Sequence, residues 1–305
     1  MLGYALRRGA LALAVALTVS AACFLLVHLS TDIAVAMAGE GARSEDIEFI
    51  RKQYGFDRPL AVQYGDWLAR ALRGDFGDSL YFRTPVAHIV SERLPVTLTL
   101  GAYAILIALA LSIPLGVVAA MRPNSWIDRL TLTIAVIGQA MPSFWFALLL
   151  MLLFGVTLGW LPISGSGTQA HFVLPAVALA YYAAPAIMRL TRSGMLEVLG
   201  SDYIRTARAK GLRPAAVLFK HALRNAVIPV VALAAVQLGF MLGGSVVIET
   251  VFALNGLGYL AWEAILHNDF PVVQAIVLLI ALFYIVLTFL ADLANGWLDP
   301  RIRIA

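Results

Sequence analysis

Residues 201–229 have the sequence SDYIRTARAKGLRPAAVLFKHALRNAVIP and form a basic, turn-rich stretch between two long apolar runs. Six of its side chains are basic and one is acidic. Ser201 is a favourable N-cap for a helix over 202–210, and Gly211 can take the left-handed conformation that often ends a helix. Pro214 is well placed to begin a second helix. The stretch therefore predicts helix, turn and helix. Its charge alone leaves two functions open: a positive loop that sets membrane topology, or a docking element for a partner.

The composition places the chain in a membrane. Of its 305 residues, 61% are hydrophobic and 13% are charged, and the mean hydropathy is +0.86. A soluble domain is typically about a quarter charged. The single cysteine, Cys23, excludes an intramolecular disulfide and a cysteine metal cluster. The net charge of +4 comes from basic residues gathered in particular loops, which is typical of membrane topology and argues against a nucleic-acid partner.

Six apolar runs are long enough to cross a hydrocarbon core of about 30 Å. They occupy approximately residues 9–29, 96–121, 130–158, 172–190, 226–248 and 272–291. The first run follows two arginines, as in a signal peptide, but its length favours a retained spanning helix. Pro175 and Pro185 are expected to bend or end the fourth helix. The predicted fold class is therefore an all-α integral membrane protein with six transmembrane helices.

The segment between the first two runs is charged and lies outside the membrane. Residues 30–95 contain ten acidic and eight basic residues. Apolar residues recur at helical spacing after Ser44 and again after Pro59, which predicts two short amphipathic helices. Their apolar faces are too small for an independent core, so we expect them to pack on the membrane domain or on a docked partner. We divide the chain into residues 1–95, the first helix with this extracytoplasmic loop, and residues 96–305, a membrane domain of five helices.

Basic residues predict the orientation of the chain in the membrane. Loops 159–171 and 249–271 contain no lysine or arginine, whereas both chain ends and the loop 191–225 are basic. Basic loops stay in the cytoplasm. We therefore expect a multi-pass protein with both termini and the loop 191–225 in the cytoplasm. The charged loop 30–95 is compatible with this orientation, because loops longer than about 60 residues escape the rule.

The sequence contains no recognisable catalytic or metal-binding constellation. The motifs HExxH and GxSxG are absent, the five histidines are scattered, and no Gly-Lys pair is available for a phosphate-binding loop. We therefore assign no catalytic, cofactor-binding or metal-binding residue, and active transport would need an ATPase on another polypeptide. An ion-coupled secondary transporter is an alternative, but it is expected to carry coupling acids within its spans. Glu249 and Asp292 lie near predicted helix ends, where an interfacial or helix–helix role is the simpler interpretation.

Five residues of the third and fifth spans are candidates for lining a translocation path. They are Gln139, Ser143, Gln237, Met241 and Ser245. Pro142 predicts a kink beside two of them. Polar groups at membrane depth suit a water-filled path, but each can equally hold two helices together. Gly239 and Gly243 form a GxxxG pattern, which favours close helix packing.

Two segments in the opening stretch, RTARAKG at 205–211 and HALRNAVIP at 221–229, occur in an ordered pattern. Together they resemble the cytoplasmic motif of permease subunits of bacterial ABC importers, in the version of the dipeptide, oligopeptide, glutathione and nickel branch. Further matches extend over essentially the whole chain: LTRS at 190–193, MLEVL at 195–199, GDFG at 74–77 and DPR at 299–301. The chain departs from the family at residues 29–33, where Asp32 is all that remains of a Pro-Gly-Asp-Pro segment.

The resemblance implies a type I ABC importer fold with a coupling helix at residues 202–210. The residues that it implies for contact with a cytoplasmic ATPase are Asp202, Arg205, Thr206, Ala207, Arg208, Ala209, Lys210 and Gly211. Small residues at 207, 209 and 211 would allow close approach, and the arginines would make charged contacts. Glu249, Asn255 and Asp269 would belong to an outer loop that faces a binding protein.

The resemblance also implies the partners of the chain. A second related permease and two ATPase subunits would complete the transporter, and an extracytoplasmic binding protein would deliver the solute. The ATPase subunits would bind ATP and Mg²⁺, and this chain would bind no cofactor. The complex would lie in the bacterial plasma (inner) membrane. Its solute would be a di- or oligopeptide; glutathione and a nickel chelate remain open, because selection is made largely by the separate binding protein.

Overall fold

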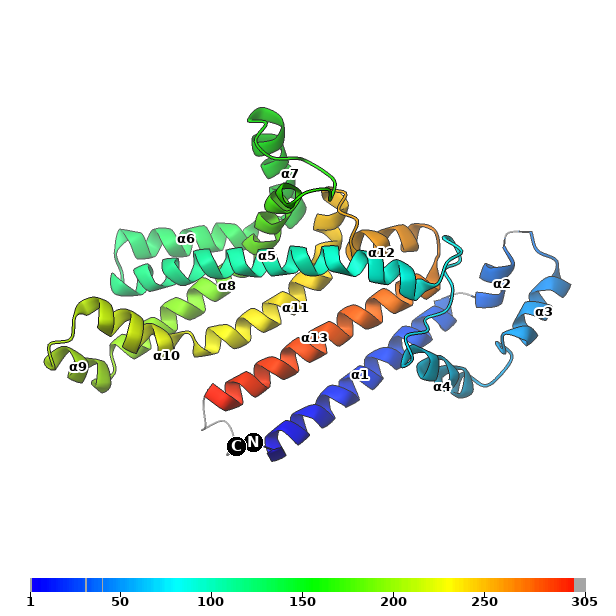
Figure 1. The fold of residues 1–305 in the computed structure, drawn as a ribbon, viewed down its shortest axis with the longest axis horizontal. Helices are drawn as coiled ribbons and strands as arrows, with labels where there is room; N and C mark the ends of the chain where they lie inside the picture. The colour runs from blue at the N-terminus through cyan, green and yellow to red at the C-terminus, as the bar shows by residue number, and fades with distance from the viewer. Residues whose placement is uncertain (1, 31, 40, 299–305) are drawn as a thin grey trace.

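The computed structural model describes residues 2–30, 32–39 and 41–298 and shows a helical membrane domain (Figure 1). Five of its helices are long and apolar enough to cross a membrane. They are α1 (Leu2–Ser30), α5 (Val86–Met121), α8 (Val173–Leu199), α11 (Ile228–Val251) and α13 (Phe270–Leu298). α5 begins ten residues before the predicted start at residue 96, because its first turns lie in the charged outer region. The DPR match at 299–301 lies outside the described residues.

The third apolar run folds as a bent pair of helices. Its elements are α6 (Trp126–Ala140), α7 (Ser143–Leu150) and a π-helix, η1 (Met151–Thr157). The helix axis bends by 105° between the two halves, Trp126–Ala140 and Ser143–Thr157. Met141 between them is extended, as expected for a residue before proline, and Pro142 has no N–H to continue the helix. The kink predicted at Pro142 is confirmed, and the single crossing expected over 130–158 corresponds to this bent pair, whose second half projects from the bundle (Figure 1).

α8 does not end at Pro175 or Pro185, and a bend at these prolines stays a prediction. It runs without a break from Val173 to Leu199. Pro175 lies in the first turn, where its missing N–H costs nothing. Pro185 removes one internal hydrogen bond, but α8 is held along its length by α5. A Cβ on Gly116 of α5 would lie 2.8 Å from the Met188 carbonyl oxygen of α8, so glycine permits this close approach.

The charged segment between α1 and α5 contains three short helices. They are α2 (Ile33–Ala38), α3 (Ser44–Gln53) and α4 (Leu60–Ala71). The two predicted amphipathic helices are therefore confirmed as α3 and α4. Trp67 of α4 joins Phe24 of α1 and Leu278 of α13 in a buried cluster, so α4 packs on the membrane domain. Asp32 accepts a hydrogen bond from the Ala34 N–H at 3.1 Å and caps α2.

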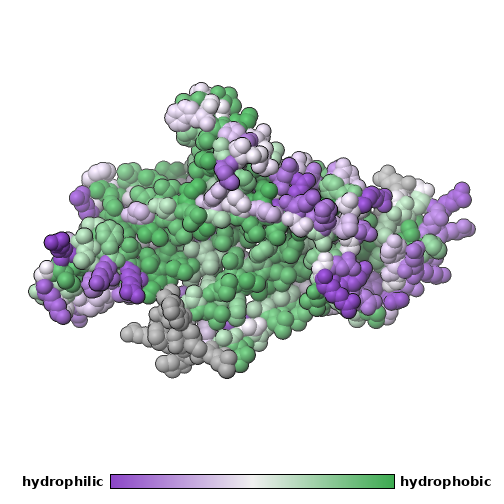
Figure 2. Space-filling model, in the orientation of Figure 1, coloured by the Kyte–Doolittle hydropathy of each residue, from purple (hydrophilic) through white to green (hydrophobic). Residues whose placement is uncertain are grey.

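The bundle is apolar in its middle and polar at its two ends. Figure 2 shows a broad hydrophobic band between two hydrophilic ends on the face that it displays. α12 (Leu257–Leu266) and the outer helices α2 to α4 lie toward one end, and α9 (Asp202–Ala209) lies at the other (Figure 1). The start of α1 and the end of α13 point toward the α9 end. The positions of these elements agree with a membrane plane that crosses the long axis of the molecule.

Candidate functional site

α9 is held by two buried side chains while the rest of its surface stays open. Ile204 is 0% exposed and Ala207 is 7% exposed. Both pack with Met195 of α8 in a hydrophobic cluster. The other members of the cluster are Val117, Ala120, Val217, Ala222 and Ala226. Because interiors pack at high density, a displacement of α9 would be transmitted through this cluster to α5 and α8.

Gly211 ends α9 in the predicted left-handed conformation, with a φ of +72°. Its N–H donates to the Arg208 carbonyl at 3.0 Å. The Leu212 N–H donates to the Ala207 carbonyl at 3.3 Å, so the chain that leaves the helix satisfies its last carbonyls. A Cβ on Gly211 would meet nothing within 4 Å. Glycine is needed here for its backbone conformation and not for packing within the chain.

The start of α9 differs from the prediction. Ser201 has the extended backbone of an N-cap, but its side chain makes no capping hydrogen bond. Its hydroxyl donates to the Val198 carbonyl at 2.6 Å, at the end of α8. Asp202 supplies the negative charge that favours a helix N-terminus. Ser201 therefore ties the α8 end to the α9 start, and its hydroxyl is not free to cap.

Seven of the eight residues predicted to contact an ATPase are exposed on α9 and its turn. These seven, which we call the α9 face, are Asp202, Arg205, Thr206, Arg208, Ala209, Lys210 and Gly211. Ala207 is the exception, because helical spacing places it beside Ile204 against the bundle. This burial leaves little of Ala207 open to a partner, and its contact with an ATPase stays a prediction. Arg205 and Asp202 form an exposed ion pair at 3.2 Å.

The HALRNAVIP segment supports α9 from the bundle side. Helical structure resumes at Pro214, as predicted. It contains a π-helix, η3 (Ala216–Leu223), followed by α10 (Arg224–Ala226). Asn225 donates to the Tyr203 hydroxyl at 2.8 Å and so links this segment to α9. A Cβ on Gly194 of α8 would lie 3.0 Å from the Ala226 carbonyl oxygen, so the segment also packs closely on α8.

An ion pair between a partly buried arginine and a buried aspartate, which no local sequence pattern indicates, links α8 to α6. Arg192 donates to both carboxylate oxygens of Asp128, at 2.5 and 2.7 Å. Asp128 is 2% exposed, and its carboxylate also accepts the Asn124 N–H at 2.9 Å. A bidentate guanidinium–carboxylate pair has a defined geometry, so it fixes the start of α6 on α8. The LTRS match at 190–193 contains this arginine, but nothing local identifies a partner 64 residues away.

A cavity of about 960 Å³ lies among α1, α7, α8, α11, α12 and α13. Two of the five candidate path residues, Ser143 and Met241, line it together with Tyr182. Gly243 also lines it, and a Cβ there would meet nothing within 4 Å. Gly239 serves close packing as well, because a Cβ there would lie 2.5 Å from the Tyr284 ring of α13. Two of the five predicted path residues therefore line the same cavity.

The other three candidate path residues lie away from the cavity lining. Gln139 is exposed and accepts a hydrogen bond from the Arg189 guanidinium at 2.8 Å. Ser245 is buried, and its hydroxyl donates to the Leu242 carbonyl of its own helix at 2.9 Å. Gln237 is also buried, at 9% exposure. A role of Gln237 and Ser245 in the path stays a prediction, and in this conformation both belong to the packed bundle.

Two carboxylates that were predicted to face a binding protein are buried instead. Glu249 is 0% exposed and accepts the Thr97 hydroxyl at 2.8 Å. It also accepts the N–H groups of Gly258 and Tyr259, at 2.7 and 3.0 Å. These N–H groups lie in the first turn of α12, where an acidic acceptor is favourable. Glu249 therefore clamps α12 onto α5 and α11.

Asp269 has a similar structural role at the other end of α12. It is 0% exposed and accepts the Ser79 hydroxyl. The N–H groups of Leu80 and Tyr81 also donate to its carboxylate, at 3.1 and 3.3 Å. Asp269 therefore holds the turn before α5 against the loop between α12 and α13. Asn255 is exposed, so its contact with a binding protein stays a prediction.

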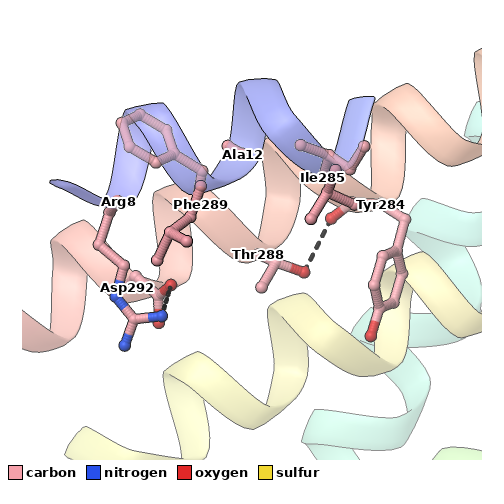
Figure 3. Close-up of a pocket in the computed structure, with 9 residues that line it drawn as sticks. Arg8, Ala12, Tyr284, Ile285, Thr288, Phe289 and Asp292 are labelled. Atoms are coloured by element: carbon pink, nitrogen blue, oxygen red, sulfur yellow. Dashed lines mark hydrogen bonds and ion pairs between the residues drawn. The ribbon is translucent and has the colours of Figure 1, made fainter. Parts of the chain in front are cut away.

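Asp292 joins two helix ends, in agreement with the interfacial interpretation. Figure 3 shows Arg8 of α1 reaching toward Asp292 of α13, and the two form an ion pair at 3.0 Å. They lie at one end of a small cavity of about 210 Å³ between α1 and α13. Ile285 and Phe289 are among its apolar lining residues. The ion pair fastens the α1 start to the α13 end.

Comparison with known proteins relates this architecture to transport. Residues 112–304 match the family model described as binding-protein-dependent transport system inner membrane component, and residues 1–101 match the model of the N-terminal part of such membrane components. A protein of Brucella abortus (strain 2308) described as a peptide transport system permease is 42% identical over 307 residues, which cover 98% of both chains. The glutathione transport system permease GsiC of Salmonella typhimurium is 41% identical over 304 residues, 99% of both chains.

The fold agrees with these sequence relatives. A solved chain of the MetNI methionine ABC transporter, in an inward-facing conformation, superposes with a TM-score of 0.58 at 22% identity. The match covers 69% of this chain and 96% of that chain. At this identity the likeness shows the fold alone, and the family models and the full-length relatives show the family. The chain belongs to the inner membrane components of binding-protein-dependent transport systems, the permease subunits of ABC importers.

Proposed function

We propose that the chain forms half of the translocation path of an ATP-driven importer for di- or oligopeptides or a similar small solute. The full-length relatives named for peptide and glutathione transport support this solute class. Glutathione is itself a peptide, so both names point to small molecules with amide bonds and free carboxylates. A nickel chelate is the remaining candidate from the same branch.

The observation that carries the proposal is the α9 face. It presents charged and small side chains at one end of the molecule, while Ile204 and Ala207 anchor the same helix in the bundle. The sequence has no Gly-Lys pair for a phosphate-binding loop, so ATP and Mg²⁺ would be bound by separate subunits. An ATPase bound to the α9 face would displace the cluster around Ile204. α5 and α8 would move with this cluster, because both contribute side chains to it.

The two ends of the molecule and the cavity between them are the proposed binding places of the remaining partners. A second related permease would complete the path around the cavity of about 960 Å³, and two ATPases would occupy the α9 end. An extracytoplasmic binding protein would dock at the end that carries α3, α4 and α12. In a bacterial inner membrane, the α9 end and both termini would lie in the cytoplasm, since the basic loops gather there.

Uptake by the reconstituted importer tests the proposed function. Proteoliposomes that hold this permease with the permease, ATPase and binding-protein products of its neighbouring genes are expected to accumulate radiolabelled dialanine or glutathione. Accumulation should require ATP on the α9 side, and it should stop when the ATPase subunits are left out. Accumulation driven by a proton or sodium gradient without ATPase subunits would instead identify a secondary transporter.

A further inference from the structure

α8 exposes a polar stripe on one face. Tyr182, Arg189, Ser193 and Glu197 are all exposed. Their spacing of seven, four and four residues places them on one side of a helix. Tyr182 lines the cavity of about 960 Å³, so the stripe runs from the cavity toward the α9 end. Tyr182 and Arg189 lie within the predicted span at 172–190, where polar side chains face the bundle interior or a water-filled space and not lipid.

Arg189 is the cation of this stripe, and it is well inside α8. It lies 16 residues after Val173 and ten residues before Leu199, which is about 15 Å from the α9 end of the helix. Its hydrogen-bond partner is the neutral amide of Gln139, at 2.8 Å. Arg192, one turn further along, is instead neutralised by Asp128. Among the described residues, no carboxylate forms an ion pair with Arg189.

A guanidinium held in this way suits a passing carboxylate. Arginine has five N–H donors in a planar fork, and the single bond to Gln139 orients the group without cancelling its charge. A carboxylate can pair with the remaining donors in bidentate geometry. Because Arg189 is exposed, such a pair would be weak enough to release the solute.

We propose that the polar stripe of α8 lines a water-filled lane, the part of the solute path between the cavity and the α9 end. Arg189 attracts the carboxylate of the solute there and binds it briefly. The inference rests on the proposed function, and it adds the chemical class that this half of the path recognises. Peptides and glutathione carry such a carboxylate at the C-terminus. Gln139 is the positioning residue that keeps the guanidinium turned toward the lane.

Thiol chemistry in the assembled importer tests the lane directly. Cys23 is the single cysteine, so a Cys23→Ala background allows one thiol to be placed by Ala186→Cys, one turn from Arg189 on the half-exposed edge of the stripe. The probes are an anionic and a cationic methanethiosulfonate, carrying sulfonate and trimethylammonium groups. We expect the thiol to react from water and the anionic reagent to be favoured, with Arg189→Gln lowering the anionic-to-cationic rate ratio by about fivefold or more.

The matched control neutralises the other charge of the stripe. Glu197 lies 11 residues from Ala186, about 16 Å along the helix, which is beyond the screening length of about 8 Å at physiological salt. Glu197→Gln should therefore leave the rate ratio nearly unchanged. Arg189→Lys keeps the charge and should retain most of the ratio.

Two results would overturn the inference. If Ala186→Cys reacts with neither reagent, lipid or the second permease covers the stripe. If it reacts with both but Arg189→Gln leaves the ratio unchanged, Arg189 does not attract anions in the lane. Uptake of dialanine by the same Cys23→Ala, Ala186→Cys importer separates these outcomes from failure of the proposed function. Normal ATP-dependent uptake with no charge preference would reject the inference alone.

Discussion

Gly211→Arg is expected to abolish ATP-dependent uptake while the chain still reaches the membrane. The left-handed backbone at Gly211 costs a non-glycine residue about 1–2 kcal/mol, which is too little to unfold the bundle. A Cβ there meets nothing within 4 Å inside the chain, so the arginine would project into the space that we propose for the ATPase. Dialanine uptake by vesicles, with the membrane content of the protein measured by immunoblot, checks this result.

Gly211→Ala is the matched control for Gly211→Arg. It imposes the same backbone strain at a φ of +72° without the long side chain. We expect it to retain at least about half of the wild-type uptake. Destabilising this turn by about 1 kcal/mol is a small change compared with the free energy of the proposed ATP-driven docking. Equal loss in both variants would assign the effect to the turn itself. Normal uptake by Gly211→Arg would contradict the docking role of the α9 face.

Glu249→Ala is expected to lower the stability of the outer region by about 3 kcal/mol or more. The substitution removes the acceptor for Thr97, Gly258 and Tyr259, and each buried donor left without a partner costs about 1–3 kcal/mol. Glu249→Gln keeps one acceptor oxygen and should cost less than half as much. Cys23 is buried, so its reaction with a thiol-sensitive dye during heating of the detergent-purified protein reports the loss of packing.

The same melting curves decide between a structural and a gating role for Glu249. A clear fall in the melting temperature of Glu249→Ala, with a smaller fall for Glu249→Gln, supports the clamp that holds α12 on α5 and α11. An unchanged melting curve together with lost uptake would contradict the clamp. That combination would make the carboxyl group part of gating, although it is 0% exposed in this conformation.

The residues of the stretch were sufficient to predict α9, the turn after it and the start of the next helix. Gly211 and Pro214 act through their own backbone preferences, so the turn after α9 and the start of the next helix could be read from the residues themselves. The kink at Pro142 was predictable for the same reason. Pro185 shows the limit of such rules, because packing of α5 against α8 keeps the helix continuous there.

The partners of buried polar groups could not be predicted, since they come from distant segments. The position of Glu249 near a helix end predicted a helix–helix role, which its hydrogen bonds confirm, but the sequence could not identify the partners, and the family resemblance placed this residue in an exposed loop. Its buried state depends on Thr97, which lies 152 residues away. The pairing of Arg192 with Asp128 depends likewise on how α6 packs on α8. For Ala207, the composition of the motif indicated close approach, but the direction of approach depends on which face of α9 meets the bundle.

Labelling of Thr206 tests most directly whether α9 docks a separate ATPase on the cytoplasmic side. Thr206 is exposed on the α9 face, so in a Cys23→Ala background Thr206→Cys places one thiol there. In inside-out vesicles, a membrane-impermeant maleimide should label this thiol, and bound ATPase subunits should protect it. In right-side-out vesicles the same reagent should leave it unlabelled. Equal labelling with and without the ATPase subunits, or labelling from the outside, would contradict the account.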